Sequence, residues 1–225
     1  MGSWSSYSLS DFLLFSPEVY ERLFVLHNQD LWPVQLVTLA LAAVVLTLVL
    51  GRAPGGTRAA FVILGAAWIV VAAVFFLGRY QTINWLGADI AFLAAFEGIV
   101  LLMLGLAGRT ELMGQQGNRL KFAAGIAVLA AGLLLYPLLA PAFGFTIVGA
   151  QVFGLTPDPT AVATLGAVAL QRSRLRFLAA LMPACWCVFT ALILWTLGRA
   201  DFFVAPALMV VALVVMVLPR TTATR

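Results

Sequence analysis

Residues 87–108 read GADIAFLAAFEGIVLLMLGLAG, a hydrophobic run that is long enough to cross a bilayer. Asp89 lies near one end of this run, and Glu97 lies close to its middle. A carboxylate at the centre of a bilayer costs about 2.5 to 3.5 kcal/mol on insertion scales. Glu97 therefore needs a hydrogen-bonding partner, a proton or a water-filled cavity.

The composition of the whole chain agrees with this stretch. Hydrophobic residues make up 63% of the 225 residues and charged residues only 10%, and the mean hydropathy is +1.06. These values are typical of an integral membrane protein rather than a soluble domain. At about 20 residues per crossing, the chain has room for seven helices and short loops. We therefore expect an all-α bundle of seven transmembrane helices in contact with the lipid bilayer.

Seven hydrophobic segments follow residue 30 and define the expected helices. They cover residues 31–51, 59–78, 86–108, 120–142, 158–171, 174–197 and 201–219. The predicted organisation is a periplasmic interfacial segment at 1–30, a transmembrane domain at 31–219 and a cytoplasmic tail at 220–225. The fifth segment is expected to be short or broken.

The basic residues between these segments predict the orientation. Ten of them fall on the side of the first inter-helix loop: Arg52, Arg58, Arg109, Arg119, Lys121, Arg172, Arg174, Arg176, Arg220 and Arg225. Three fall on the other side: Arg22, Arg79 and Arg199. Because loops rich in Lys and Arg stay in the cytoplasm, we expect the N-terminus outside and the C-terminus in the cytoplasm of a bacterial inner membrane.

A short amphipathic helix is predicted before the first crossing. Ser16, Pro17 and Glu18 have the order of an N-cap, a first helical position and an early acidic residue. Apolar residues then recur at helical spacing from Tyr20 to Leu31, with most charged residues on the other face. This pattern favours a helix that lies in the plane of the membrane interface.

The segment at 158–171 is too short for a complete crossing. As a helix, Pro159 to Gln171 would span only about 20 Å, whereas the hydrocarbon core is about 30 Å thick. The preceding residues 143–160 read FGFTIVGAQVFGLTPDPT and are rich in Gly and Pro. We expect the helix to be broken here, with Asp158 as N-cap and Pro159 as first helical residue. Non-helical backbone at this depth must be buried in protein or line a wet cavity.

The candidate binding residues are polar groups in or near these segments: Glu97, Asp89, Gln151, Asp158, Tyr136 and Gln35. One interpretation places Glu97 and Asp89 in a proton or cation site open to the outside. They would lie about 12 Å apart along one helix. The other interpretation is structural: Glu97 is neutral and hydrogen-bonded to Gln35, Tyr136 or Thr164, and Asp89 pairs with Arg79.

Several functional classes are disfavoured by the sequence. His27 is the sole histidine, which excludes a multi-histidine metal site and bis-histidine haem. The motifs HExxH and GxSxG are absent, so no catalytic residue is assigned and an enzyme is the least favoured class. No cofactor or metal is expected. The basic residues are explained as topology signals, so nucleic-acid binding is not expected.

Four stretches carry a resemblance to a known family. They are SDFLLFSPEVYERLFVLHNQDLWPVQ at 10–35, Ile83-Asn84, Tyr136-Pro137 and VFGLTPDPTAVATLG at 152–166. On these residues the chain resembles a bacterial family of multipass membrane proteins of unknown function. The resemblance implies an integral inner-membrane protein and supplies no activity or catalytic residue.

Two functions from different classes remain. The preferred one is passage or sensing of a small solute, ion or proton through a polar cavity that opens to the outside, built from the third, fourth and fifth segments. The alternative is a non-catalytic accessory or assembly subunit that docks other membrane subunits, or a homo-oligomer. Glu97 and the broken segment favour the first, whereas the near-absence of loops favours the second.

Overall fold

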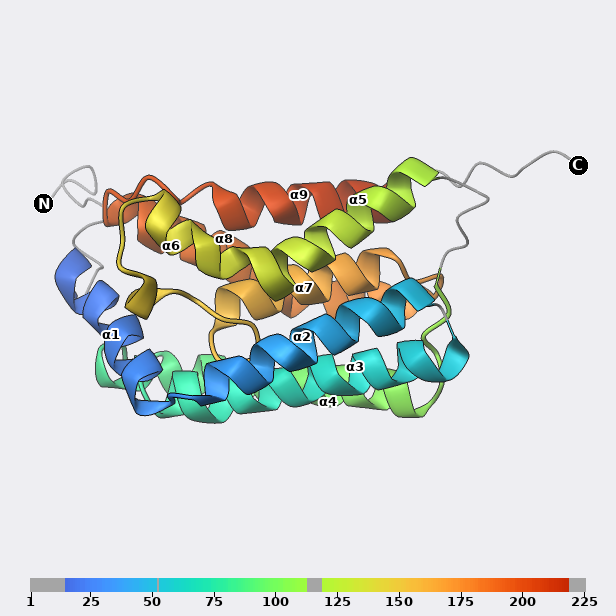
Figure 1. The fold of residues 1–225 in the computed structure, drawn as a ribbon, viewed down its shortest axis with the longest axis horizontal. Coiled ribbons are helices and arrows are strands. Elements are labelled where there is room, and N and C mark those ends of the chain that lie inside the picture. The colour runs from blue at the N-terminus through green and yellow to red at the C-terminus, as the bar shows by residue number, and fades with distance from the viewer. Residues whose placement is uncertain (1–14, 52, 113–118, 219–225) are drawn as a thin grey trace, which may run out of the picture.

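A computed structural model describes residues 15–51, 53–112 and 119–218 (Figure 1). Its α-helices are α1 (Pro17–Asp30), α2 (Val34–Gly51), α3 (Pro54–Val70), α4 (Gly87–Leu106), α5 (Arg119–Ala130), α6 (Leu139–Ala142), α7 (Pro157–Ala169), α8 (Leu178–Thr196) and α9 (Val204–Val217). Within these ranges no strand occurs, apart from one isolated bridge between Leu112 and Gln171. The predicted tail at 220–225 and most of residues 1–16 lie outside the described residues.

Short π and 3-10 segments extend or connect these helices. They are η3 (Val71–Leu77), η4 (Tyr80–Thr82), η5 (Ala131–Leu135), η6 (Tyr136–Leu138), η7 (Ile147–Gly149) and η8 (Arg174–Arg176). Of these, η3 prolongs α3, and η5 with η6 joins α5 to α6. Pro137 lies at the junction, where its missing N–H group interrupts the regular helix.

Five helical stretches are long and apolar enough to cross a membrane, which indicates a membrane protein. They are Val34–Gly51, Gly55–Thr82, Gly87–Leu106, Arg119–Ala142 and Arg174–Thr196. Two further apolar helices match predicted segments but are shorter, with 14 residues in α9 and 13 in α7. The expected break before the fifth segment is confirmed, since residues 150–156 contain no helix.

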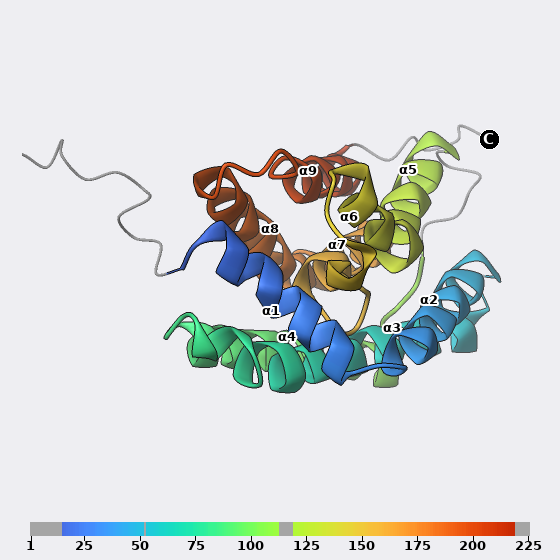
Figure 2. The ribbon, with the colours of Figure 1, turned by 60° about the vertical axis from the view of Figure 1, so that its left-hand side comes forward.

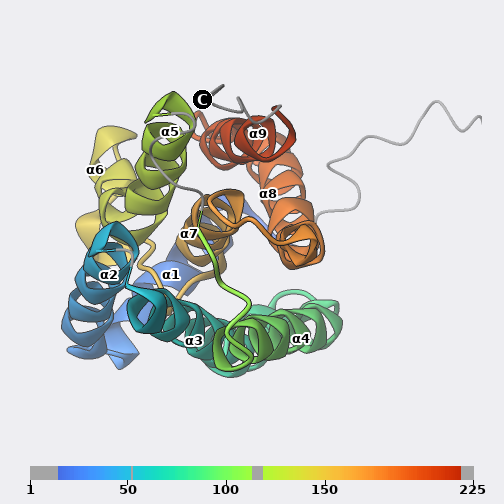
Figure 3. The same ribbon diagram turned by 90° about the vertical axis from the view of Figure 1, so that its right-hand side faces the viewer.

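The short helix α7 is the centre of the molecule. All of its residues are buried, and it packs against α3, α5, α8 and α9. The end view shows α7 inside a ring of longer helices (Figure 3). The chain reaches it from the end of the bundle where α1 and α6 lie, through the non-helical segment 150–156 (Figure 1).

Glycines allow the closest helix contacts. A Cβ atom built on Gly65 would lie 2.7 Å from the carbonyl oxygen of Gly98, so α3 and α4 are in backbone contact there. Between α7 and η5, which continues α5, a Cβ atom on Gly132 would overlap the backbone of Ala163. Such small residues let membrane helices approach closely when no hydrophobic driving force acts between them.

The basic residues of the described ranges lie toward the two ends of the bundle. Those near the start of α3, the end of α4, the start of α5 and the α7–α8 connection share one end, opposite α1 (Figure 1). Two of these basic side chains also donate hydrogen bonds to backbone carbonyl groups at the C-terminal ends of helices. Arg176 donates to Gln171 O at 3.0 Å and Met216 O at 2.8 Å, and Lys121 donates to Leu218 O at 2.6 Å. Cationic groups at helix C-termini are stabilising.

Helix α1 lies across the other end of the bundle (Figure 2). It begins as predicted: Pro17 occupies the first turn, and the Ser16 side chain accepts a hydrogen bond from Val19 N. Its apolar face includes the buried residues Tyr20, Leu23 and Phe24. That face packs on the protein core, and the placement of α1 in the plane of the membrane interface stays a prediction.

Candidate functional site

The N-terminal end of α7 is built by a tight backbone turn. Gly154 has φ +76°, a conformation that other residues rarely adopt, and its N–H donates to Thr160 Oγ1 at 2.9 Å. Thr156 is the N-cap residue, with extended backbone, and Pro157 fills the first turn. The prediction that Asp158 is the N-cap was wrong, because Asp158 already lies inside the helix.

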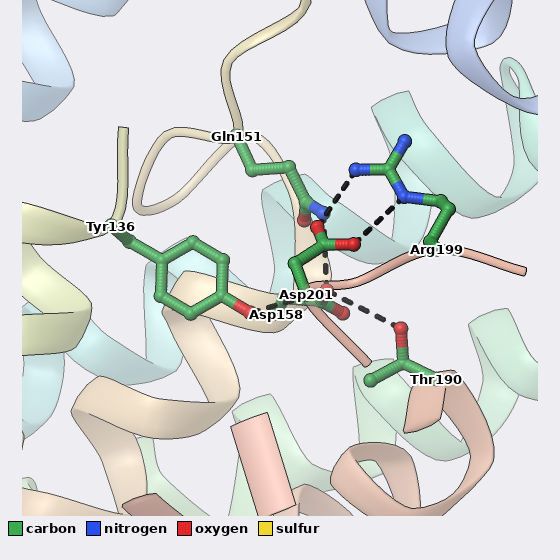
Figure 4. Close-up of polar contacts among 6 residues, drawn as sticks. All are labelled: Tyr136, Gln151, Asp158, Thr190, Arg199 and Asp201. Atoms are coloured by element: carbon green, nitrogen blue, oxygen red, sulfur yellow. Dashed lines mark hydrogen bonds and ion pairs between the residues drawn. The ribbon is translucent and has the colours of Figure 1, made fainter. Parts of the chain in front are cut away.

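The carboxylate of Asp158 is buried and receives four side-chain hydrogen bonds. Figure 4 shows the three that come from Tyr136, Gln151 and Thr190. Trp186 Nε1 donates to Oδ1 at 2.7 Å. The other oxygen, Oδ2, accepts from Gln151 Nε2 at 3.0 Å, Tyr136 OH at 3.3 Å and Thr190 Oγ1 at 3.3 Å. These donors, together with the amide end of α7, stabilise a negative charge at the centre of the bundle.

The two oxygens of Asp158 have neighbours of different kinds. Trp186, at Oδ1, can only donate a hydrogen bond. At Oδ2 the hydroxyls of Tyr136 and Thr190 can also accept, and the amide of Gln151 can accept after a flip. Gln151 Oε1 is buried and accepts no hydrogen bond from the described residues. Exchanging the amide oxygen and nitrogen of Gln151 by a flip therefore costs Oε1 no hydrogen bond. The shell can therefore accommodate a carboxylate, or a carboxylic acid with its proton on Oδ2.

Asp158 and its four donors, Tyr136, Gln151, Trp186 and Thr190, form the Asp158 cluster. A small polar pocket lies between this cluster and one end of the bundle. Its volume is about 30 Å³, and its lining includes Tyr136 and Gln151 from the cluster as well as Glu21, Arg199 and Asp201. A polar cavity needs about 10 to 15 Å³ of such space to hold a water molecule. The pocket is therefore large enough for water or a bare ion and too small for an organic solute.

Two of the residues that line the pocket, Arg199 and Asp201, form an ion pair. Arg199 Nε and Nη2 donate to the two carboxylate oxygens of Asp201 at 3.0 and 2.7 Å (Figure 4). The guanidinium carbon also lies 3.7 Å from the centre of the Phe145 ring. Such bidentate and cation–π contacts fix the guanidinium in one orientation. The carboxylate of Glu21, on α1, lines the same pocket.

Helix α1 is tied to the segment that precedes α7. His27 Nε2 lies 3.0 Å from Leu155 O, and Asn28 Nδ2 donates to Val148 O and Ala150 O, both at 2.7 Å. Burial lowers the pKa of His27 from 6.5 to about 4, outweighing the bond to Leu155, which raises it. His27 is thus neutral near pH 7, and its Nε2–H donates to the carbonyl.

The structure brings together three of the six predicted site residues: Tyr136, Gln151 and Asp158. Gln35 lies apart, and its Nε2 donates to Asn28 O at 2.7 Å. Asp89 is exposed in the first turn of α4. The cavity was expected to involve the third segment, but α4 supplies no lining residue of the polar pocket.

Glu97 is buried in α4 with 2% of its surface exposed, and its Oε1 has no hydrogen-bond partner in the described part of the chain. The expected bonds to Gln35, Tyr136 or Thr164 are absent among those residues, since Thr164 instead accepts from Trp68 Nε1 at 2.9 Å. The predicted pair of Asp89 with Arg79 was also wrong, because Arg79 forms an ion pair with Asp30.

Sequence reasoning missed four residues of the site. Trp186 and Thr190 are four positions apart in α8 and so share one face, which is a recognisable signal in an otherwise apolar helix. Arg199 and Asp201 are separated by one residue in the α8–α9 turn, and their opposite charges predict a local pair. No group of three or more His, Cys, Asp or Glu side chains suited to a metal ion occurs in the described ranges.

Comparison with known proteins gives a family and no activity. Residues 17–225 match the family of unknown function DUF6064. The chain belongs to the DUF6064 family. Neither the curated proteins nor the solved structures gave a match to this DUF6064 protein. The match covers the whole of the Asp158 cluster and the polar pocket, so both are features of the family domain in this chain.

Proposed function

We propose that this DUF6064 protein is a proton- or cation-responsive pathway or sensor of the bacterial inner membrane, with Asp158 as its central binding group. The chain would cross the bilayer seven times, the fifth crossing being made by segment 150–156 together with α7. The N-terminal end, with α1 and the polar pocket, would face the outside, in agreement with the separation of basic residues to the opposite end.

The observation that carries this proposal is the shell around Asp158. An ionisable side chain inside a membrane bundle is costly and marks a functional site by default. A purely structural carboxylate needs donors alone, whereas Oδ2 here faces three groups that can reverse their hydrogen bonds. Two of the three also line the polar pocket. Asp158 itself does not line the pocket, so a proton would pass between the pocket and Oδ2 by way of Tyr136 or Gln151.

The size of the pocket narrows the class of ligand. At about 30 Å³ it admits water, a proton carried by water or a small ion. A larger solute would require α1 to leave its bonds to segment 148–155. Glu97 is kept as a second candidate group on the pathway, because its buried Oε1 lacks a partner among the described residues.

The test is proton flux into liposomes that contain the purified protein and a pH-sensitive dye. Asp158→Asn should abolish pH-dependent flux, and Glu97→Gln should reduce it if Glu97 belongs to the same pathway. Asp89→Asn is the matched control, since Asp89 is exposed. In a sensor without flux, the fluorescence of Trp186 should still change with pH in the wild type and not in Asp158→Asn.

Absence of both signals, with stable copurification of other membrane subunits, would refute the proposal in favour of the accessory-subunit alternative. A flux that persists unchanged in Asp158→Asn would refute only the role of Asp158 and would leave the proposed pathway standing. Folding of each variant is checked by its thermal transition in detergent, so that loss of flux is not confused with loss of structure.

A further inference from the structure

The chain that leads from η7 toward α7 separates two cavities. Gly149 and Gln151 line the polar pocket described above, whereas Val148, Ala150 and Val152 line a second space on the other side. The second space is a groove of about 490 Å³ between this segment, the end of α1 and the start of α2.

The groove is polar at one end and apolar at the other. Asn28, from α1, and Gln35, from the first turns of α2, line the end near α1, and Leu39 follows one helical turn further along α2. Val152 and Pro137 complete the apolar part. Because α2 is long and apolar enough to cross a membrane, the apolar part lies deeper in the bilayer than the polar end.

Two buried hydrogen-bond acceptors at the polar end receive no hydrogen bond from the described residues. The amide nitrogen of Asn28 donates to Val148 O and Ala150 O, and that of Gln35 donates to Asn28 O. These bonds assign the amide orientations and leave Asn28 Oδ1 and Gln35 Oε1 buried without partners in the described part of the chain. Both side chains are 8% exposed. Unpaired buried acceptors are destabilising unless a donor is supplied.

Trp32 indicates the depth in the bilayer at which the polar end of the groove lies. Its side chain lines the groove and is 66% exposed. Exposed tryptophans concentrate at the boundary between headgroups and acyl chains. The two unpaired oxygens therefore lie at headgroup level, and the apolar part of the groove lies at the level of the acyl chains.

We propose that this groove binds a bilayer phospholipid with a primary ammonium headgroup, that is, phosphatidylethanolamine. One acyl chain would lie along Leu39 and Val152, and the ammonium group would donate to Asn28 Oδ1 and Gln35 Oε1. A choline headgroup has no N–H donor and cannot satisfy these oxygens. The oxygens have almost no exposed area, so binding includes a small shift of the groove wall. The inference is independent of the role of Asp158.

The test compares two lipids that differ only in the donor. The full-length protein is incorporated in nanodiscs of equal amounts of phosphatidylethanolamine and phosphatidylcholine with identical acyl chains. Lipid that stays bound after mild detergent extraction is counted by native mass spectrometry. We expect about a fivefold to tenfold preference for phosphatidylethanolamine, the size expected for one or two hydrogen bonds.

Three variants locate the bound lipid. Gln35→Leu should abolish most of the preference, whereas Gln81→Leu, at an exposed glutamine that does not line the groove, should keep it. Leu39→Trp leaves the polar end intact and fills the apolar part, so it should reduce the retention of both lipids. Equal retention of the two lipids by the wild type, or unchanged retention in Leu39→Trp, would overturn the proposal.

Discussion

The four hydrogen-bond donors around Asp158 predict that its negative charge can be removed by mutation while the shape and the hydrogen bonds of the side chain are kept. In Asp158→Asn the remaining oxygen can accept from Trp186, and the new amide can donate to Tyr136, Thr190 or a flipped Gln151. We therefore expect a loss of less than about 2 kcal/mol in the free energy of unfolding.

Asp158→Leu is the contrasting variant, because it leaves up to four buried donors without an acceptor. Each unpaired buried group costs about 1 to 3 kcal/mol, so Asp158→Leu should be destabilised by more than about 3 kcal/mol. Thermal and denaturant unfolding in detergent measures both variants. Equal losses for Asn and Leu would show that the hydrogen bonds do not rearrange, which removes the main support for a reversible proton site.

His27 predicts a specific loss of stability in acid. Burial lowers its pKa to about 4 in the folded protein, against about 6.5 in the unfolded chain. Between these values the unfolded chain holds more protons, so stability is complete above pH 6.5 and falls as the pH decreases toward 4. His27 is the sole histidine, so comparison with a variant that lacks it separates its contribution from those of the carboxyl groups.

The variant His27→Gln isolates this effect. A glutamine amide can still donate to Leu155 O but does not titrate. The thermal transition of His27→Gln should therefore change less between pH 6.5 and 5 than that of the wild type. An identical decrease in both proteins would mean that other groups cause the acid sensitivity.

At the residue scale, the sequence identified three of the five residues of the Asp158 cluster, that is, of Asp158 and its four hydrogen-bond donors. Tyr136, Gln151 and Asp158 were predicted because polar residues beside Pro and Gly breaks are unusual in apolar segments. Trp186 and Thr190 were not, because both residue types are common in membrane helices for packing and local hydrogen bonds. Their role depends on α8 being turned toward α7, which the sequence of α8 alone does not specify.

At the element scale, the break before α7 was predictable and its cap was not. In the sequence Thr156-Pro157-Asp158-Pro159 either Thr156 or Asp158 precedes a proline, so either can begin a helix. Thr156 has the extended backbone, with φ −128° and ψ 152°. The carboxylate of Asp158 is bonded by four side chains of the surrounding segments, and this tertiary preference cannot be read from local sequence.

The contact of α7 with η5, the continuation of α5, gives a prediction at the same scale. A Cβ atom at Gly132 would overlap the backbone of Ala163 and approach Pro159 O to 2.7 Å. Gly132→Ala must therefore separate the helices that hold the Asp158 cluster. We expect a loss of about 1 to 3 kcal/mol and a weaker pH response of Trp186 fluorescence.

Gly51 offers the matched control for this substitution. A Cβ atom there would meet no heavy atom within 4 Å, and Gly51 ends α2. Gly51→Ala should leave the thermal transition unchanged or slightly raised, because alanine reduces the entropy of the unfolded chain. If Gly132→Ala is equally well tolerated, the close approach of η5 and α7 does not exist in the membrane.

At the scale of the whole molecule, hydropathy identified the segments but not their neighbours. Each of the seven predicted segments corresponds to a helix, because the apolar runs are long and separated by turns and charges. That α7 lies inside the ring of the other helices (Figure 3) depends on helix contacts that have no local signature. For the same reason Glu97 was expected near Tyr136, whereas no bond joins it to the Asp158 cluster among the described residues.

The orientation of the bundle is the last prediction, and it decides from which side protons reach Asp158. Gln81 is exposed in η4, shortly before α4, at the end of the bundle where α1 lies. Glu111 is exposed beyond the end of α4, at the opposite end (Figure 1). In a protein from which Cys185 and Cys187 have been removed, each position is replaced by cysteine. Intact cells are then treated with a membrane-impermeant thiol reagent.

Gln81→Cys should be labelled in intact cells, and Glu111→Cys only after lysis, because the basic residues gather at the Glu111 end and stay in the cytoplasm. The polar pocket is lined by Glu21 of α1 and by Arg199 and Asp201 of the α8–α9 turn, all at the Gln81 end. Labelling of Gln81→Cys in intact cells would therefore show that the pocket opens to the outside. The reverse result would keep the bundle and the Asp158 shell but make Asp158 respond to cytoplasmic pH.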